Sequence, residues 1–169
     1  MLQLSELTGR HDKASFDCGN AELNSHLRQI AGQHARKSLA RVYVACEDTD
    51  PGRIVAYYSL SICELGSEEL PELFRKRFPN RVPAVRLGRL AVARANQRQG
   101  VGELMLIDAM RNVVHVDAVT GAVALLVDAK NDEAKRFYLE YRFIEMSEQP
   151  LSLFLPIASI KEALARANR

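Results

Sequence analysis

The stretch VARANQRQGVGELMLIDAM, residues 92–110, leads from an apolar segment through a polar loop with two glycines into a helical pattern. One face of the predicted helix is apolar, at Leu106, Ala109, Met110 and Val113. The opposite face is polar, at Asp108, Arg111, Asn112 and His115. A strand, a glycine loop and a helix in this order point backbone N–H groups and the positive end of the helix dipole at one place, where proteins commonly bind phosphate. The stretch therefore predicts an anion-binding loop.

Two common phosphate loops do not fit these residues. A Walker loop has a lysine after its last glycine, whereas Glu103 follows Gly102 in this chain. The dinucleotide-binding fingerprint needs a third glycine at the position that Met105 occupies. The remaining candidate is the hexapeptide QRQGVG, residues 97–102.

This hexapeptide resembles the (Arg/Gln)-x-x-Gly-x-(Gly/Ala) pattern of the GNAT acyltransferases. The resemblance implies that acetyl-CoA is the cosubstrate. It also implies that the cofactor's diphosphate is wrapped by Gln97, Arg98, Gln99, Gly100, Val101 and Gly102. Arg94 and Arg98 would add positive charge at the rim of the loop. For the glycine pair alone, a solvated turn in which a glycine only caps the helix is the alternative.

A second stretch resembles the same family. The run AVALLV, residues 122–127, predicts a strand covered on both faces, and NDEAKRFYLEYRF, residues 131–143, predicts a helix capped by Asn131. In GNAT enzymes a similar helix lies beside the cofactor's sulphur, so the resemblance implies Tyr138 as the catalytic residue and Asn131 and Phe137 as cofactor contacts. It further implies that the strand backbone at Leu90, Ala91 and Val92 pairs with the pantetheine arm, with an N–H near Val92 polarising the thioester carbonyl.

These residues also have structural alternatives. Tyr138 lies on the apolar stripe of the helix and can be a core tyrosine, and Asn131 can be a plain helix cap. The family usually has glycine before the final phenylalanine of this stretch, whereas this chain has Arg142. The turn after the helix can therefore differ from that of the family.

The resemblance implies an α/β (α+β) GNAT fold, with a mixed, mostly antiparallel sheet of about six to seven strands flanked by about four helices. The residues predict strands at 41–47, 53–62, 84–92, 122–127 and 151–156, of which the first two form a hairpin across residues 48–52. Helices are predicted after Asn20, after the glycine loop, after Asn131 and in the tail 160–169. A shorter helix-compatible stretch covers residues 67–78.

Composition limits the remaining possibilities. A chain of 169 residues, 47% of them apolar, favours a single domain over residues 1–169. Neither a signal-peptide core nor a membrane-spanning run is present, so we expect a cytoplasmic protein with no membrane partner. Three widely spaced cysteines without a CxxC pair and four scattered histidines argue against a disulfide framework and a metal site.

The chemistry of acyl transfer gives a hint about the acceptor. In an acyl-CoA transferase a neutral amine attacks the thioester, and Tyr138 would donate a proton or a hydrogen bond to the leaving sulphur. No acidic residue stands out as a general base. An α-amine, with a pKa of about 8, needs less help from a base than a lysine amine with a pKa of about 10. We therefore expect an α-amine as the acceptor.

A basic segment suggests that the acceptor carries phosphate. Between Leu73 and Arg98 the chain has Arg and Lys residues but no acid, while Glu64, Glu68 and Glu69 lie just upstream. Such segregation is expected of a surface that faces a phosphate backbone, although charge runs are more often simply solvated. The candidate RNA-binding residues are Arg75, Lys76, Arg77, Arg86 and Arg89, and Arg36 and Lys37 of the first helix would add to this surface.

Over almost the whole chain the order of segments resembles one GNAT branch, the tRNA-acetylating toxins of bacterial toxin-antitoxin pairs. The matching stretches are FDCGNAELN (16–24), VAYYSL (55–60), RLGRLAVA (86–93), the glycine loop, ALLVDA (124–129), AKRFY (134–138) and LSLFLP (151–156). The resemblance implies aminoacyl-tRNA as substrate, a ribbon-helix-helix antitoxin, operator DNA bound through the antitoxin complex, and a homodimer. The alternatives are a GNAT enzyme that acts on protein amines or a small amine, and a non-catalytic binding module that keeps the fold.

Overall fold

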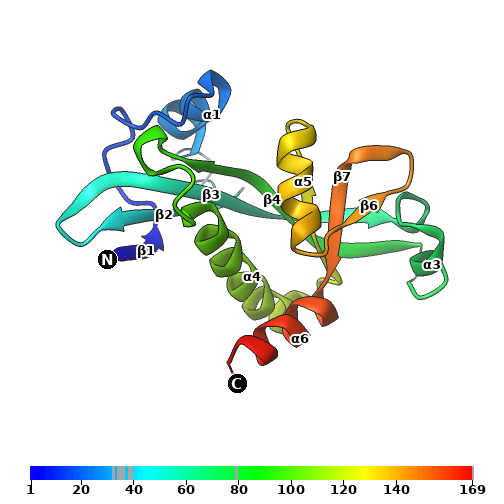
Figure 1. Ribbon diagram of the computed structural model, residues 1–169. Helices are drawn as coiled ribbons and strands as arrows, with labels where there is room; N and C mark the ends of the chain where they lie inside the picture. Colours follow the sequence, from blue (N-terminus) through cyan, green and yellow to red (C-terminus); the bar gives the residue numbers. More distant parts are fainter. Residues whose placement is uncertain (32, 34–36, 38–39, 79, 169) are drawn as a thin grey trace. The chain divides into compact units, whose positions relative to one another are not determined.

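The computed structural model describes residues 1–31, 33, 37, 40–78 and 80–168 (Figure 1), so that His34 and Arg36 of the predicted first helix lie outside the described residues. The strands are β1 (Leu2–Glu6), β2 (Arg41–Glu47), β3 (Asp50–Gly66), β4 (Arg81–Val92), β5 (Ala124–Asp128), β6 (Ile144–Met146) and β7 (Gln149–Pro156). The α-helices are α1 (Ala21–Ser25), α3 (Glu72–Arg75), α4 (Val101–Thr120), α5 (Asp132–Glu140) and α6 (Ile157–Ala167). A π-helical segment, His26–Ala31, continues α1.

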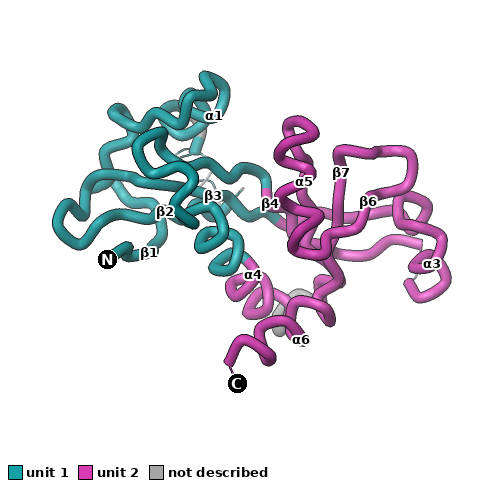
Figure 2. Tube along the Cα trace, viewed as in Figure 1, with its two compact units in different colours: residues 1–61, 88–109 teal, residues 62–87, 110–169 magenta. Residues whose placement is uncertain are grey.

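The strands follow the hydrogen-bonded order β1-β2-β3-β4-β5-β7-β6. The pairs β1–β2, β2–β3, β5–β7 and β6–β7 are antiparallel, and β4–β5 is parallel. The predicted mixed, mostly antiparallel sheet is therefore confirmed. The chain divides into two compact units, residues 1–61 with 88–109 (unit 1) and residues 62–87 with 110–169 (unit 2), as Figure 2 shows.

Unit 1 contains the predicted first helix and hairpin. The Asn20 side chain accepts a hydrogen bond from the Leu23 N–H at 3.0 Å, which confirms the predicted N-cap. Strands β2 and β3 form the hairpin, but β3 already begins at Asp50, so the connection is shorter than predicted. Bulges on either side of Cys46 adjust the register. The core of the unit is built around Phe16, Leu27, Val42, Val44, Ile54 and Tyr57.

Unit 2 is organised around the apolar strand β5. This strand is buried from Ala124 to Val127 and lies between β4 and β7, as its uninterrupted apolar run predicted. The core cluster on one side includes Leu65, Leu70, Val82, Ala84, Leu126 and Phe154. No helix within the described residues is long and apolar enough to cross a membrane.

Some elements differ from the prediction. Strands β1 and β6 were not predicted, because each is short and only partly buried, which leaves a weak pattern in the sequence. The stretch 67–78 is not one helix: Pro71 has extended backbone angles and separates a 3-10 turn, Ser67–Glu69, from the single turn of α3. Asp108, predicted on the solvated face of α4, instead accepts a hydrogen bond from Tyr58 at 2.6 Å.

Tyr57 is a fully buried member of the unit 1 core. Its ring meets Phe16 edge-on at 5.5 Å, and its hydroxyl donates a hydrogen bond to the Leu23 carbonyl at 2.7 Å. Burial raises the pKa of Tyr57 above the ordinary value of 10.0. The folded chain therefore holds the phenolic proton more tightly than the unfolded chain does. The corresponding stability is fully present below about pH 10 and is lost as the pH rises above that value.

We expect the free energy of unfolding to fall as the pH rises above about 10, and Tyr57→Phe to make this fall smaller. Near neutral pH the variant should be less stable by about 1 kcal/mol, because the Leu23 carbonyl loses its buried donor. Urea unfolding near neutral pH and at about pH 11 measures both effects. Wild type and variant with the same alkaline loss of stability would contradict this assignment.

Candidate functional site

The glycine loop between β4 and α4 turns twice into left-handed backbone conformations, at Arg98 (φ 60) and Gly100 (φ 80). The Gly100 carbonyl accepts the first hydrogen bond of α4, from the Leu104 N–H at 3.1 Å. The first N–H groups of a helix have no partner within the helix. Where right-handed and left-handed residues alternate before the helix, successive N–H groups can point into one concavity that suits an anion. The loop thus has a left-handed backbone at the start of α4, and its binding of an anion stays a prediction.

Glutamine side chains brace this loop from within. The Gln97 amide donates hydrogen bonds to the carbonyls of Cys18 at 2.8 Å and Val92 at 2.9 Å. The Gln99 amide donates to the Ala95 carbonyl at 3.2 Å. Gln97 was predicted to contact the cofactor. In the structure its side chain connects the loop to the end of β4 and to the turn before α1.

The turn before α1, residues 16–19, makes further contacts with the loop. The Arg94 N–H donates to the Asp17 carbonyl at 2.9 Å, and the guanidinium forms an ion pair with the Asp17 carboxylate at 3.6 Å. Hydrogen bonds from the Gly19 N–H and the Asn24 amide, with the charge of Arg94 as a smaller cause, lower the pKa of Asp17. The charge of Arg94 is therefore shared with an acid, whereas Arg98 is exposed and forms no ion pair with a described residue.

The structure describes the parallel pairing of β4 with β5 within unit 2 only. The β4–β5 register covers Val85 to Leu87, although β4 continues to Val92. Just beyond the strand, the Ala93 N–H donates to the Val55 carbonyl of β3 at 2.7 Å. A contact of the backbone at Leu90, Ala91 and Val92 with a pantetheine arm stays a prediction.

Tyr138 lies in α5 and is only 6% exposed. Its ring packs edge-on against Phe137 at 5.2 Å and against Phe143 at 5.5 Å. Burial alone raises the pKa of Tyr138, with no contribution from a hydrogen bond or a charge. The Tyr138 hydroxyl makes no hydrogen bond to a described residue. Tyr138 is thus a core tyrosine by its ring and an available donor by its hydroxyl.

Asn131 caps α5. Its side-chain oxygen accepts a hydrogen bond from the Ala134 N–H at 2.9 Å, which confirms the predicted N-cap. The side-chain amide group stays on the surface, because Asn131 is exposed. A contact between Asn131 and a cofactor remains a prediction.

Arg142, which stands where the family usually has glycine, takes a left-handed backbone conformation. Its φ is 68, and its N–H and that of Phe143 return to the carbonyls of Leu139 at 3.0 Å and Tyr138 at 3.3 Å. This is the left-handed ending that many helices have, usually with glycine at this position. The turn after α5 therefore keeps the usual shape despite the arginine.

We expect Arg142→Gly to raise the free energy of unfolding by about 0.5–1 kcal/mol, because glycine takes a positive φ without the Cβ penalty. The matched control is Arg136→Gly inside α5, which should lower it by about 1 kcal/mol. Denaturant unfolding of both variants gives the comparison. A loss of stability in Arg142→Gly would show that its side chain, and not its backbone, matters here.

The predicted RNA-binding residues differ in their surroundings. The Arg86 guanidinium is paired with Asp128, and Arg75 donates to the Leu70 carbonyl at 2.9 Å and to the Ser147 hydroxyl at 3.0 Å. Arg89 donates to the Gly88 carbonyl at 2.8 Å. Lys76 and Arg77 are exposed, and the Arg77 guanidinium lies over the Phe74 ring at 5.6 Å.

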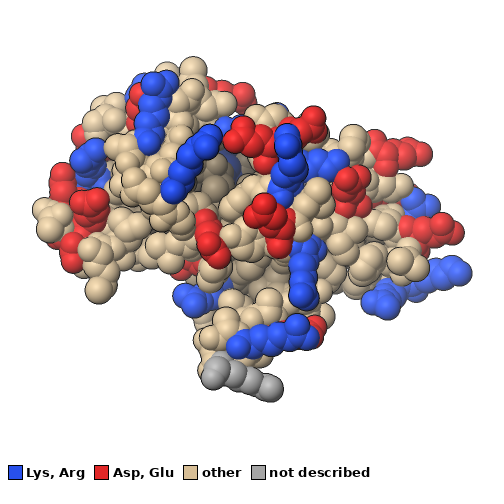
Figure 3. Space-filling model, viewed as in Figure 1, with Lys and Arg blue, Asp and Glu red and all other residues tan. Residues whose placement is uncertain are grey.

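An acidic residue upstream of the basic segment forms an ion pair with it. Arg81 is paired with Glu64 at 3.1 Å, within unit 2. On the face seen in Figure 3, lysine and arginine side chains alternate with acidic ones and do not form an unbroken basic surface. The segregation of charge along the chain is therefore only partly kept in space.

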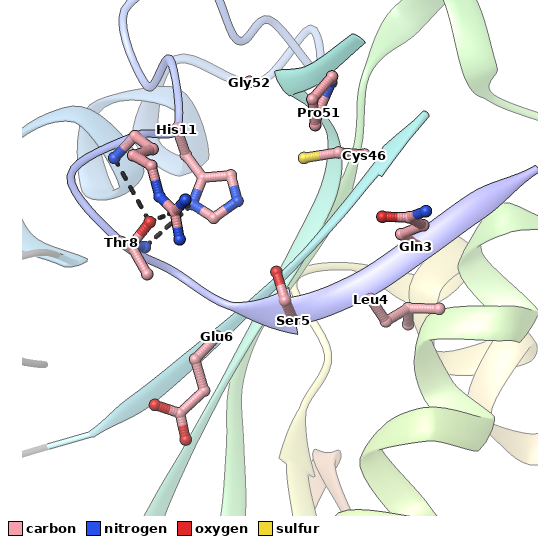
Figure 4. A pocket seen from close by; sticks show the side chains of 10 residues that line it. Gln3, Leu4, Ser5, Glu6, Thr8, His11, Cys46, Pro51 and Gly52 are labelled. Atoms are coloured by element: carbon pink, nitrogen blue, oxygen red, sulfur yellow. Dashed lines mark hydrogen bonds between the residues drawn. The ribbon is translucent and has the colours of Figure 1, made fainter. Parts of the chain in front are cut away.

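A hollow of about 560 Å³ lies at the β1 edge of unit 1. It is lined by Gln3, Leu4, Ser5, Glu6, Thr8, Arg10, His11, Cys46, Pro51 and Gly52. Figure 4 shows Thr8 and His11 joined by hydrogen bonds at its wall, the shorter from the Thr8 N–H to His11 Nδ1 at 2.9 Å. These residues are different from those predicted to bind the cofactor or RNA.

The left-handed glycine loop before α4 is a feature expected of one class of protein, the coenzyme A-dependent acyltransferases. Comparison with known proteins specifies the family. Residues 7–143 match the model described as the Acetyltransferase (GNAT) family, so the chain belongs to the GNAT acetyltransferases.

The chain is 35% identical over 144 residues to the "tRNA-acetylating toxin" of Mycobacterium tuberculosis, covering 85% of each protein. It is similar to the solved structure of AtaT complexed with acetyl-methionyl-tRNAfMet, with a TM-score of 0.90, 31% identity and 97% and 99% of the two chains covered. A tyrosine-to-phenylalanine mutant of AtaT, bound to acetyl-CoA and to the C-terminus of the antitoxin AtaR, gives a TM-score of 0.83 at 30% identity, covering 96% and 98%. The KacTA–DNA complex gives 0.83 at 30% identity, covering 98% and 99%.

Proposed function

We propose that this protein transfers the acetyl group of acetyl-CoA to the α-amine of aminoacyl-tRNA and so acts as a toxin that blocks translation. The observation that carries the proposal is the likeness, along almost the whole chain, to AtaT bound to acetyl-methionyl-tRNAfMet. The tRNA-acetylating relative, 35% identical, supports the same activity. No acidic residue stands out in the sequence as a general base, which accords with an α-amine acceptor that needs little deprotonation near neutral pH.

In this proposal the backbone N–H groups of residues 98–102 hold the diphosphate, and the β4 backbone at Leu90, Ala91 and Val92 holds the pantetheine arm. The amine forms a C–N bond with the acetyl carbon, the C–S bond breaks, and the sulphur leaves as a thiolate. The hydroxyl of Tyr138 donates a hydrogen bond to that sulphur.

The raised pKa of Tyr138 bears on this last step. A phenol with its ordinary pKa would give its proton to a thiolate at a cost of about 2 kcal/mol, and burial makes the transfer less favourable still. Tyr138 therefore acts as a neutral donor that stabilises the developing charge. The amine's proton leaves to solvent.

The partners follow those of the relatives. AtaT has been solved with the antitoxin AtaR, and KacTA with DNA. We accordingly propose an antitoxin for this chain and, through the complex with it, operator DNA. That the antitoxin is of the ribbon-helix-helix type and that the toxin is a homodimer belong to the same proposal, as do the RNA contacts, for which the exposed Lys76 and Arg77 are the first candidates.

To test the activity, we would incubate the protein with labelled acetyl-CoA and total charged tRNA, with deacylated tRNA as the control. Label should appear on charged tRNA only. Tyr138→Phe should slow the transfer by about 100-fold, the effect of losing a positioned proton donor. Tyr43→Phe, which removes an unpaired hydroxyl elsewhere, should not. Label on proteins or small amines, with none on charged tRNA, would refute the proposed substrate, and an unchanged Phe variant would remove Tyr138 from the mechanism.

A second prediction concerns the loop. A Cβ at Gly100 would meet no atom within 4 Å, so Gly100→Val strains the backbone and obstructs an approaching anion without disturbing the protein's own packing. Gly121→Val is the matched control, since Gly121 also has a positive φ and open space but lies after α4. We expect both to lose roughly 1–2 kcal/mol of stability and only Gly100→Val to lose affinity for coenzyme A in calorimetry. Equal affinity in the two variants would exclude this loop as the diphosphate site.

A further inference from the structure

We propose that Tyr58 and Asp108 are positioning residues. The hydrogen bond between them fixes helix α4 and thereby sets the geometry of the coenzyme A loop. This inference rests on the proposed function and adds to it a residue pair outside the loop. The Tyr58 hydroxyl donates to Asp108 Oδ2 at 2.6 Å, a hydrogen bond between strand β3 and helix α4 within unit 1. Tyr58 is fully buried and Asp108 half-buried.

Strand β3 contacts the chain on both sides of the loop. Before the loop, the Ala93 N–H donates to the Val55 carbonyl of β3 at 2.7 Å. After the loop, Asp108 receives the hydroxyl of Tyr58, three residues further along the same strand. A rigid strand rises by about 3.3 Å per residue, so these two attachments are spaced by about 10 Å along β3. Both sides of the loop are thereby attached to the same strand, β3.

Helix α4 transmits this anchor to the loop. Asp108 lies seven residues, two helical turns, after Val101, and therefore on the same face of the helix, about 10 Å from its start. Val101, Met105 and Asp108 follow one another on that face, the first two of them buried. The direction of the first N–H groups of α4 is the direction of the helix axis. A contact that fixes the axis near Asp108 fixes where those groups point.

The chemistry of the pair suits such a task. The carboxylate of Asp108 places negative charge in the helix whose N-terminus receives a polyanion. This charge does not favour binding of the ligand, so a benefit from Asp108 must come from the hydrogen bond that it accepts. A hydrogen bond from a phenol to a carboxylate is short and directional, and leaving either group unpaired in a buried place is unfavourable. An asparagine would keep the acceptor without the charge. The hydrogen bond, and not the charge, is what the loop needs.

Tyr43 provides an internal comparison. Its ring stacks on that of Tyr58 at 5.0 Å and lies opposite it in the β2–β3 register. Its hydroxyl makes no hydrogen bond to a described residue. Tyr43→Phe and Tyr58→Phe therefore remove the same atom from the same aromatic stack, and only the second removes an anchor of α4.

The test is calorimetric titration with coenzyme A, together with steady-state kinetics, for wild type, Tyr58→Phe, Asp108→Ala, Asp108→Asn and Tyr43→Phe. We expect Tyr58→Phe and Asp108→Ala to raise the Kd for coenzyme A and the KM for acetyl-CoA by about tenfold, as for the loss of one hydrogen bond. The KM for charged tRNA should stay within about twofold. Asp108→Asn and Tyr43→Phe should bind coenzyme A like wild type.

Several outcomes would overturn the inference. Unchanged coenzyme A affinity in Tyr58→Phe, or an equal loss in Tyr43→Phe, would do so, as would an Asp108→Asn variant as weak as Asp108→Ala. If Tyr58→Phe unfolds at the assay temperature, the comparison of Asp108→Ala with Asp108→Asn tests the inference by itself. A wild type that binds no coenzyme A would refute the proposed function itself, whereas a wild type that binds it with no loss in these variants would refute only the positioning role.

Discussion

The reversal of the chain between β4 and α4 is the constraint on which this protein depends. Its backbone passes through left-handed conformations at Arg98 and Gly100 and leaves the first N–H groups of a twenty-residue helix without partners in that helix. Hydrogen bonds from Gln97 hold this shape to the end of β4 and to the turn before α1. An anion site built from backbone N–H groups requires such hydrogen bonds, because mobile N–H groups do not keep a common direction.

The proposed donor to the leaving sulphur is the phenol of Tyr138. Aromatic neighbours bury its ring, and the same burial that raises its pKa keeps it protonated near neutral pH. A neutral donor whose position is fixed by packing can stabilise a leaving thiolate without surrendering a proton. The turn that follows, with Arg142 at a positive φ, ends the helix in the left-handed way that usually takes a glycine.

Local patterns predicted those elements whose cause is local. Asn20 and Asn131 are N-caps because their side chains bond the backbone three residues on, and β5 is central because it is apolar on both faces. Strand β1 and strand β6 were missed because a short, half-buried strand is defined by its neighbour and not by its own residues. The left-handed backbone of the glycine loop was predictable because glycine spacing reflects backbone conformation directly.

The sequence by itself thus determined the main strands and helices apart from β1, β6 and the stretch 67–78, the glycine loop before α4, and the family resemblance that made Tyr138 the candidate donor. Only the tertiary structure decided that Gln97 braces the loop, that Arg86 is neutralised by Asp128 and that Asp108 receives the hydroxyl of Tyr58. The physical reason is that these contacts join residues from 42 to 79 positions apart. A side chain's own identity states which bonds it can form, and the packing of distant segments selects which of them it does form.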